Sequence, residues 1–93
     1  MIHLRYFASL RESLGRDAEE LDLQEINAQA GAENGGNTVA AVRAALRERG
    51  SPWAEALAED RRILAAVNQE MARPETPVAD GDELAFLSPV TGG

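Results

Sequence analysis

The sequence contains no cysteine, which excludes disulfide bonds, thiolate metal sites and a cysteine nucleophile. Histidine occurs once, at His3, so a histidine-rich metal site is impossible and a Ser-His-Asp triad would depend on that residue alone. We interpret His3 as an ordinary strand residue. Any covalent chemistry of this chain therefore has to use a group other than a thiol.

Long apolar runs and phosphate-binding loops are also missing. The longest aliphatic run, 63–67, is far shorter than the ~20 apolar residues that span a bilayer. Arg5 and Arg11 interrupt the segment where a signal peptide would be apolar, so we expect a cytoplasmic protein with no membrane contact. Neither GxxxxGK[ST] nor GxGxxG occurs, so we expect the chain itself to bind no nucleotide, metal or other cofactor.

Basic residues are outnumbered by acidic ones. Lys and Arg together number 9, Asp and Glu 16, and the net charge of −7 would repel a phosphate backbone, so we expect no nucleic-acid partner. Nothing apolar beside the acidic pairs in the sequence would raise a carboxyl pKa, so we interpret these pairs as solvated surface groups. They are Glu19-Glu20, Glu59-Asp60 and Asp80-Asp82-Glu83.

Length and composition predict one globular domain over residues 1–93, because 44% of the residues are hydrophobic and 27% charged. Alternating apolar and polar residues over 2–8 predict a first strand. After a turn at Gly15, Leu21 and Leu23 alternate with acidic residues and predict a second strand at a sheet edge. We expect these two strands to form a hairpin with a wide loop.

The middle of the chain predicts a loop and then a helix. Residues 24–37 are rich in Asn, Gln, Gly and Ala, with Ile26 as the apolar anchor, and we interpret them as a mobile surface insertion. Thr38 is a capping residue for a helix over 38–50 that ends at Gly50. Its buried face is predicted to hold Val39, Val42 and Leu46, and its outward face Arg43, Arg47 and Glu48.

A short second helix and a strand follow. Ser51 is predicted to cap this helix, Pro52 to lie in its first turn, and Trp53 and Leu57 to pack in the core one turn apart. The apolar run over 63–67 is too short for a helix and predicts a buried strand.

The last third of the chain predicts one more strand and a tail. Pro74 and Pro77 interrupt the chain, residues 80–82 form a tight turn, and 83–87 is the last strand. Residues 88–93 are predicted to be an extended, flexible tail. The order strand, strand, helix, short helix, strand, strand predicts an α+β protein in which the main helix crosses one face of a mixed sheet, the ubiquitin-like β-grasp.

The sequence ends in Gly92-Gly93, which predicts a carboxylate at the end of a narrow stalk. Glycine has no Cβ, so such a stalk fits a channel that other residues could not enter, and residues 89–93 reach at most ~17 Å. Once a partner enzyme had converted the carboxylate to a mixed anhydride with AMP, its carbonyl carbon would accept a sulfur or nitrogen nucleophile. Gly93 is therefore the candidate reacting residue.

An apolar docking patch is predicted beside this tail. If Leu84 and Phe86 face the helix, Ala85 and Leu87 face the open side of the sheet, and Phe7 faces the same way on the first strand. Apolar groups exposed on an otherwise acidic surface are typical of a docking site. The predicted patch consists of Phe7 and Leu87, with Met71 nearby.

Four stretches carry a resemblance to a known family: Tyr6-Phe7-Ala8 with Arg11-Glu12, the run LAAVNQ over 64–69, the turn DGDE over 80–83 and the ending AFLSPVTGG over 85–93. They resemble the MoaD-type ubiquitin-like sulfur carriers, the small subunits of molybdopterin synthase. The resemblance covers nearly the whole chain and implies a β-grasp protein.

The resemblance implies a subunit that is not catalytic alone. An E1-like activating enzyme would use ATP to adenylate the Gly93 carboxylate, which would then become a thiocarboxylate. The tail would enter the large synthase subunit, in a heterotetramer of two small and two large subunits, and donate sulfur to cyclic pyranopterin monophosphate. Gly92 would be the steric partner of Gly93, and the residues implied to contact the partner are Phe7, Met71, Leu87, Pro89, Val90 and Thr91.

Two departures and three alternatives accompany this resemblance. Ser88 stands where the family often has a proline, and the loop 24–37 is longer than usual. The alternatives are a sulfur carrier of another pathway, such as the thiamine-type one, a protein modifier that joins Gly93 to target lysines, and an interaction domain with an inert terminus. A carrier and a modifier need the same tail, so the sequence leaves these two open.

Overall fold

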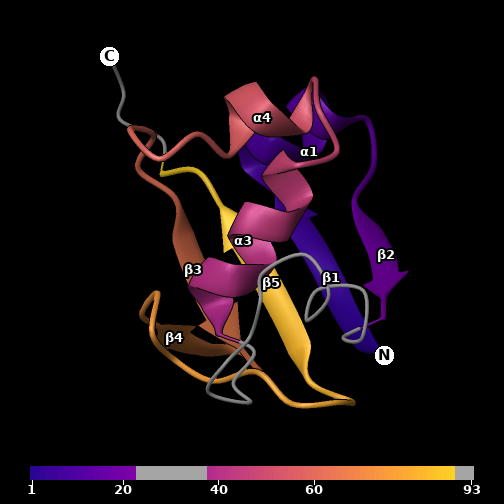
Figure 1. The fold of residues 1–93 in the computed structure, drawn as a ribbon, viewed down its shortest axis with the longest axis vertical. Helices are drawn as coiled ribbons and strands as arrows, with labels where there is room; N and C mark the ends of the chain where they lie inside the picture. Colours follow the sequence, from indigo (N-terminus) through magenta and orange to yellow (C-terminus); the bar gives the residue numbers. More distant parts are fainter. Residues whose placement is uncertain (23–37, 90–93) are drawn as a thin grey trace.

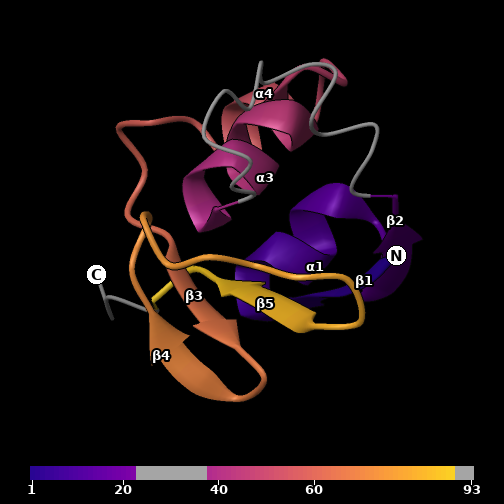
Figure 2. The ribbon, with the colours of Figure 1, turned by 60° about the horizontal axis from the view of Figure 1, so that its bottom comes forward.

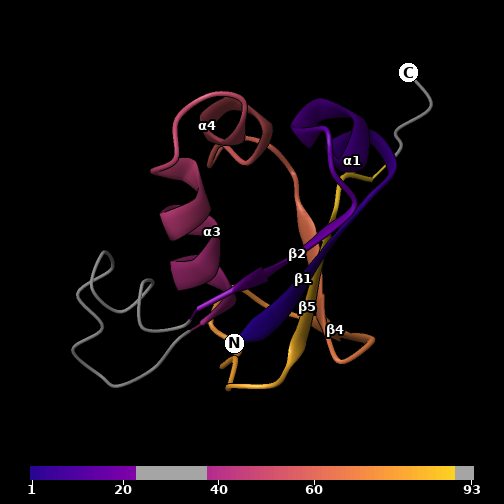
Figure 3. The same cartoon turned by 90° about the vertical axis from the view of Figure 1, so that its right-hand side faces the viewer.

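The computed structural model describes residues 1–22 and 38–89, and its five strands form one mixed sheet in the order β2-β1-β5-β3-β4. β1 and β5 run parallel, and the other neighbours run antiparallel. Helix α3 lies against one face of the sheet, α1 lies beyond the end of its strands, and α4 packs against both α3 and α1 (Figures 1 and 3). The elements are β1 (Ile2–Phe7), α1 (Ala8–Leu14), β2 (Ala18–Leu21), α3 (Val39–Arg47), α4 (Trp53–Ala56), β3 (Leu64–Val67), β4 (Glu70–Ala72) and β5 (Glu83–Leu87).

This architecture is the predicted α+β β-grasp, and its core lies between α3 and the sheet. Thr38 caps α3, because its hydroxyl oxygen accepts a hydrogen bond of 3.1 Å from the Ala41 amide. The apolar stripe of α3 faces alternate residues of β1 and β5. Side chains on one face recur about every 3.6 residues in a helix and every second residue in a strand. Residues from these elements that are at most 4% exposed are Ile2, Leu4, Tyr6, Val39, Val42, Leu46, Leu84 and Phe86.

The helix α1 corrects the predicted wide loop between the first two strands. β1 ends at Phe7 rather than at residue 8, because Ala8 takes a φ of 55° and the chain turns into the helix. Leu10 and Leu14, one turn apart, are buried under α4. Gly15 ends the helix with a φ of 73° and donates its amide to Arg11 O. The spacing Leu-x-x-x-Leu-Gly in the sequence could have predicted this helix.

The edge strand β4 was also missed, and the second strand begins earlier than predicted. β3 and β4 form a hairpin at one edge of the sheet (Figure 2), joined by Asn68 and Gln69 at φ values of 51° and 71°. At the other edge β2 covers Ala18–Leu21, which confirms an edge strand. Leu23 and the predicted loop 24–37 lie outside the described residues.

The surroundings of α4 differ from the prediction in detail. Trp53 and Leu57 are buried, as predicted. Pro52 precedes the helix as its N-terminal cap instead of lying in its first turn, and the Ser51 hydroxyl bonds the Glu55 carboxylate instead of a backbone amide.

Arg43 does not point away from the protein as predicted. Its side chain is half-buried and donates to three backbone carbonyls that follow α4: Nε to Leu57 O at 2.9 Å, and Nη2 to Ala58 O and to Arg61 O, the last at 3.0 Å. Burial lowers the pKa of this guanidinium from its ordinary value, with Arg47 adding to the effect. Arg43 thus fixes the 57–61 segment onto α3.

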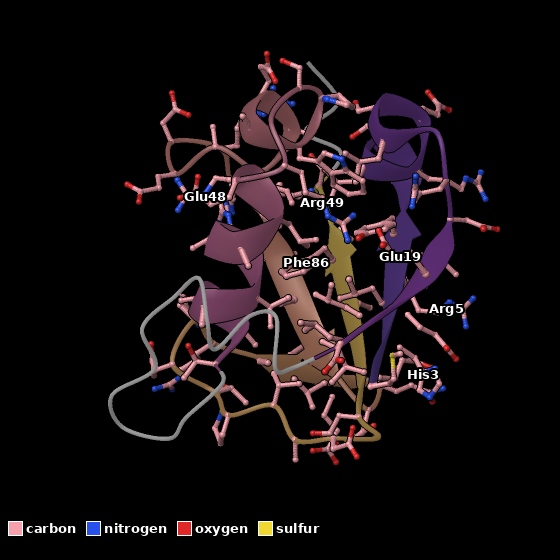
Figure 4. All side chains as sticks on the ribbon, turned by 45° about the vertical axis from the view of Figure 1, so that its right-hand side comes forward. His3, Arg5, Glu19, Glu48, Arg49 and Phe86 are labelled. Atoms are coloured by element: carbon pink, nitrogen blue, oxygen red, sulfur yellow. The ribbon has the colours of Figure 1, made fainter. Side chains whose placement is uncertain are left out.

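A cluster around Glu19 joins β2 to the helical layer. Arg49 donates two hydrogen bonds of 2.9 Å to the Glu19 carboxylate, the Tyr6 hydroxyl donates a third at 2.8 Å, and Figure 4 shows Arg49 and Glu19 pointing toward one another. Arg49 also lies over the Trp53 ring, 4.6 Å from its centroid. Burial opposes ionisation of Glu19, but the bonds from Arg49 and Tyr6 outweigh it and hold the pKa of Glu19 below its ordinary value.

The lowered pKa gives stability a defined pH dependence. Glu19 ionises more readily in the folded state than in the unfolded state. Its contribution to the free energy of unfolding is therefore present at pH values above the ordinary glutamate pKa, and it is lost as the pH falls through the pKa of Glu19 in the folded state. We expect the free energy of unfolding of wild type to exceed that of Glu19→Gln at neutral pH, and the gap to shrink on acidification below about pH 4.5. Urea denaturation of both proteins from pH 7 to pH 3 measures this, and a gap that is constant with pH would contradict it.

Candidate functional site

The candidate site is the sheet face opposite α3, at the end where β5 leads into the C-terminal segment. The strand register pairs Phe7 with Leu87 across β1 and β5, and Leu87 with Leu64 across β5 and β3. Directly paired residues point to the same side of a sheet, so these three side chains form one apolar row. Phe7 is 41% exposed, and Leu64 and Leu87 are half-buried.

A second row lies next to the first. The register aligns Arg5 of β1 with Ala85 of β5, then with Ala66 of β3 and Met71 of β4. Met71 is 68% exposed, and the Arg5 guanidinium lies 5.5 Å from the centroid of the Phe7 ring. We use the name open-face patch for the exposed and half-buried apolar residues of the two rows, which are Phe7, Leu64, Ala66, Met71 and Leu87.

The patch confirms part of the predicted docking surface and corrects the rest. The structure brings Phe7 and Leu87 together and places Met71 on the same face. Ala85 faces this side, as predicted, but it is only 5% exposed, because a methyl group on a central strand presents little surface. Leu64 and Ala66 were not predicted to belong to the patch, because their side-chain direction follows from the pairing of β3 with β5.

Charged residues flank the open-face patch at the end that lies away from the C-terminal segment. His3 is paired in register with Glu20 and Glu83, and its Nδ1 lies 3.3 Å from the Glu20 carboxylate. His3 and Arg5 both point outward from β1 in Figure 4. His3 is therefore a strand residue with an exposed side chain, as interpreted from the sequence.

Hydrogen bonds join two of the stretches that resemble the family, the run 64–69 and the turn 80–83. The Asn68 amide Nδ2 donates to the Asp82 carboxylate at 3.1 Å, while its Oδ1 accepts the Glu83 amide at 3.0 Å. The Ala79 backbone N–H, and after it Asn68, lower the pKa of Asp82 below its ordinary value. Asn68 thus ties the turn before β5 to the turn after β3, which fixes the position of β5.

The C-terminal segment is described only at its start. Ser88 and Pro89 follow β5 directly and are half-buried. The predicted tail residues Val90, Thr91, Gly92 and Gly93 lie outside the described residues. Four residues beyond Pro89 span at most ~14 Å, so a carboxylate on Gly93 could reach no farther than that from Pro89.

The described residues offer few other chemical centres. Within 1–22 and 38–89, no three His, Asp or Glu side chains are grouped so as to hold a metal ion. None of the helices within these residues could span a bilayer.

Among known protein families, the ThiS family matches residues 22–93 of this chain. The chain belongs to the ThiS family. This ThiS-family chain is 41% identical to the molybdopterin synthase sulfur carrier subunit of Escherichia coli and 40% identical to that of Haemophilus influenzae. Both matches cover 100% of this chain and 100% of the relative, and they confirm the resemblance found in the sequence.

Solved structures show the same fold. SAMP1 from Haloferax volcanii superposes on the ThiS-family chain with a TM-score of 0.63 at 27% identity, over 99% of this chain and 98% of that one. One chain in a Helicobacter pylori complex of subunits 1 and 2 of molybdopterin-converting factor gives a TM-score of 0.57 at 23% identity, over 99% and 97% of the two chains.

Proposed function

We propose that this chain is the sulfur carrier subunit of a molybdopterin synthase. The observation that carries the proposal is the identity of 40–41% over the full length of two proteins with that name. The open-face patch adds to it, because an apolar face beside the C-terminal segment suits a protein that docks while its end enters a partner. In this proposal residues 1–93 are one β-grasp domain, and 88–93 serve as the reactive tail.

The chemistry centres on the Gly93 carboxylate. A carboxylate is a poor electrophile, so an E1-like enzyme first joins one of its oxygens to the α-phosphorus of ATP, with pyrophosphate as the leaving group. A nucleophile equivalent to sulfide then displaces AMP from the carbonyl carbon and leaves a thiocarboxylate. Gly92, which has no side chain, gives the thiocarboxylate room in a narrow channel.

The large subunit is the proposed recipient of the tail. Phe7, Met71 and Leu87 contact it through the open-face patch, while Pro89, Val90 and Thr91 contact it along the channel that leads to the substrate, cyclic pyranopterin monophosphate. The small subunit supplies the activated sulfur, and the large subunit supplies the substrate site. The Helicobacter pylori complex supports this pairing, because one of its chains has the present fold. Two small and two large subunits in a cytoplasmic assembly complete the proposal.

A protein modifier is the second candidate function. SAMP1, a small archaeal modifier protein, is 27% identical to this chain. The same acyl adenylate would then react with a lysine amine of a target and form an amide bond through Gly93. The sequence itself contains no lysine, so a second copy could not be joined to a lysine of the first.

Reconstitution tests the proposal. The purified chain is incubated with ATP, an E1-like enzyme and a sulfide source, and is then desalted and mixed with a large subunit and cyclic pyranopterin monophosphate. We expect molybdopterin to form only after the first incubation. A chain that forms amide bonds to lysines and yields no molybdopterin would support the modifier function instead.

A further inference from the structure

Arg5 is a cation in the middle of the open sheet face. It belongs to the second row of that face, between the row of Phe7 and the row of His3, and its exposed side chain points outward from β1 (Figure 4). Its guanidinium lies 5.5 Å from the centroid of the Phe7 ring, so the cation leans toward the open-face patch. A partner that covers Phe7 therefore covers Arg5 as well.

Arg5 has no ion-pair partner in the part of the chain that the structure describes. Its direct neighbours across β2 and β5 are Ala18 and Ala85, which carry no charge. The acidic residues that share this face on β2 and β5 are Glu20 and Glu83, and they lie one row farther from the patch. Within residues 1–22 and 38–89, no salt bridge joins Arg5 to a carboxylate.

Docking over Phe7 would remove water from the Arg5 guanidinium. A cation that loses water without gaining a partner is unfavourable, so a protein that covers this face has to offer it a hydrogen-bond acceptor. A carboxylate matches the planar guanidinium, because it accepts two parallel hydrogen bonds and also balances the charge. A backbone carbonyl would supply the acceptor without the charge. The complementary group on the partner is therefore an Asp or Glu side chain.

The net charge of −7 makes this requirement selective. The chain as a whole repels acidic surfaces, so an acidic group on a partner is favourable only where a local cation faces it. A partner with an apolar socket but no acidic group would leave Arg5 unpaired, and a partner with the acidic group elsewhere would meet like charge. Arg5 thus discriminates among proteins that have similar apolar surfaces.

We propose that Arg5 is a specificity-determining residue of the docking face and binds a carboxylate of the large synthase subunit. This inference rests on the proposed function, which makes the large subunit the partner that covers the open-face patch. The patch supplies the area of contact, and Arg5 selects which apolar surface is accepted. Arg5 takes no part in the chemistry at Gly93, so it affects the affinity for the large subunit and not the rate of sulfur transfer within the complex.

Titration calorimetry with the purified large subunit tests this assignment. Arg5→Gln is expected to raise Kd about fivefold, and Arg5→Glu to raise it further, because two carboxylates would then face each other. Arg73→Gln is the matched control, since Arg73 is exposed, lines a hollow between α3 and β3 on the other face of the sheet, and changes the charge equally. In molybdopterin formation, Arg5→Gln should raise the carrier concentration that gives the half-maximal rate and leave the maximal rate unchanged.

Charge reversal on the large subunit tests whether Arg5 acts by direct contact. Each surface Asp or Glu of that subunit is replaced by Lys in turn, and one replacement should restore the affinity of Arg5→Glu about fivefold while weakening the binding of wild type. Circular dichroism establishes that each variant is folded. If no replacement restores binding, or if Arg5→Gln and Arg73→Gln bind equally well, the inference is wrong while the proposed function stands. If wild type does not bind the large subunit, the proposed function is wrong as well.

Discussion

Removal of Gly93 is expected to abolish sulfur transfer while the protein still folds and still binds its partner. Without this residue the carboxylate moves back by ~3.5 Å, whereas reacting atoms have to approach to within about 3 Å. We expect no replacement for it, because the chain has no cysteine and the described residues hold no metal-binding cluster. The loss should be at least a thousandfold, because the reacting centre would be out of reach.

Molybdopterin formation with the purified large subunit measures this loss. Appending one alanine after Gly93 serves as the matched variant, and it should fail too, because the added side chain and length would block the channel. Circular dichroism should be unchanged in both variants, and binding to the large subunit should be unchanged in the chain without Gly93. A chain without Gly93 that still accepts sulfur and yields molybdopterin would place the chemistry elsewhere.

A charge in the open-face patch is expected to have the second largest effect. Phe7→Asp should weaken association with the large subunit by more than ~2 kcal/mol, which is about a thirtyfold rise in Kd. Phe7 shares a row with Leu64 and Leu87, so a carboxylate there would be buried against apolar groups on docking. Because Phe7 is 41% exposed in the free chain, the fold should tolerate the substitution.

Ser13→Asp is the control for this variant. Ser13 is exposed on α1, outside the patch, and the substitution changes the net charge equally. Titration calorimetry should show near wild-type affinity for Ser13→Asp and a large loss for Phe7→Asp, with similar unfolding midpoints for both. An unchanged affinity for Phe7→Asp would remove the open-face patch from the proposed interface.

Local patterns predicted much of this fold. Alternation placed β1 and β5, the stripe of Val39, Val42 and Leu46 placed α3, and the buried run placed β3. The element order then predicted the β-grasp, because one amphipathic helix and several half-buried strands have few ways to cover one another. These features need only short-range information.

Features that depend on tertiary contacts were missed. α1 has seven residues, and its buried pair Leu10 and Leu14 was overlooked between two strand patterns. β4 has three residues and one large apolar side chain, Met71, so its pairing depends on the Asn68-Gln69 turn. Arg43 looked like a solvent-facing residue because the carbonyls that it binds belong to a segment 14 to 18 positions away.

The candidate site was predicted unevenly for the same reason. The alternation of side chains within β1 and β5 predicted that Phe7 and Leu87 lie on the open face of the sheet. The positions of Leu64 and Ala66 depend on the register of β3 against β5. The role of Gly92-Gly93 was inferred from chemistry and from the family resemblance, and it stays a prediction because these residues lie outside the described part.

The most direct test of the sulfur-carrier proposal is the intact mass of this chain produced in cells together with its activating enzyme. We expect a fraction heavier by the difference between one sulfur and one oxygen atom, with fragmentation placing the change at Gly93. This fraction should disappear when the activating enzyme is omitted. A chain whose mass never changes, or one found only in amide linkage to lysines of other proteins, would contradict the proposal.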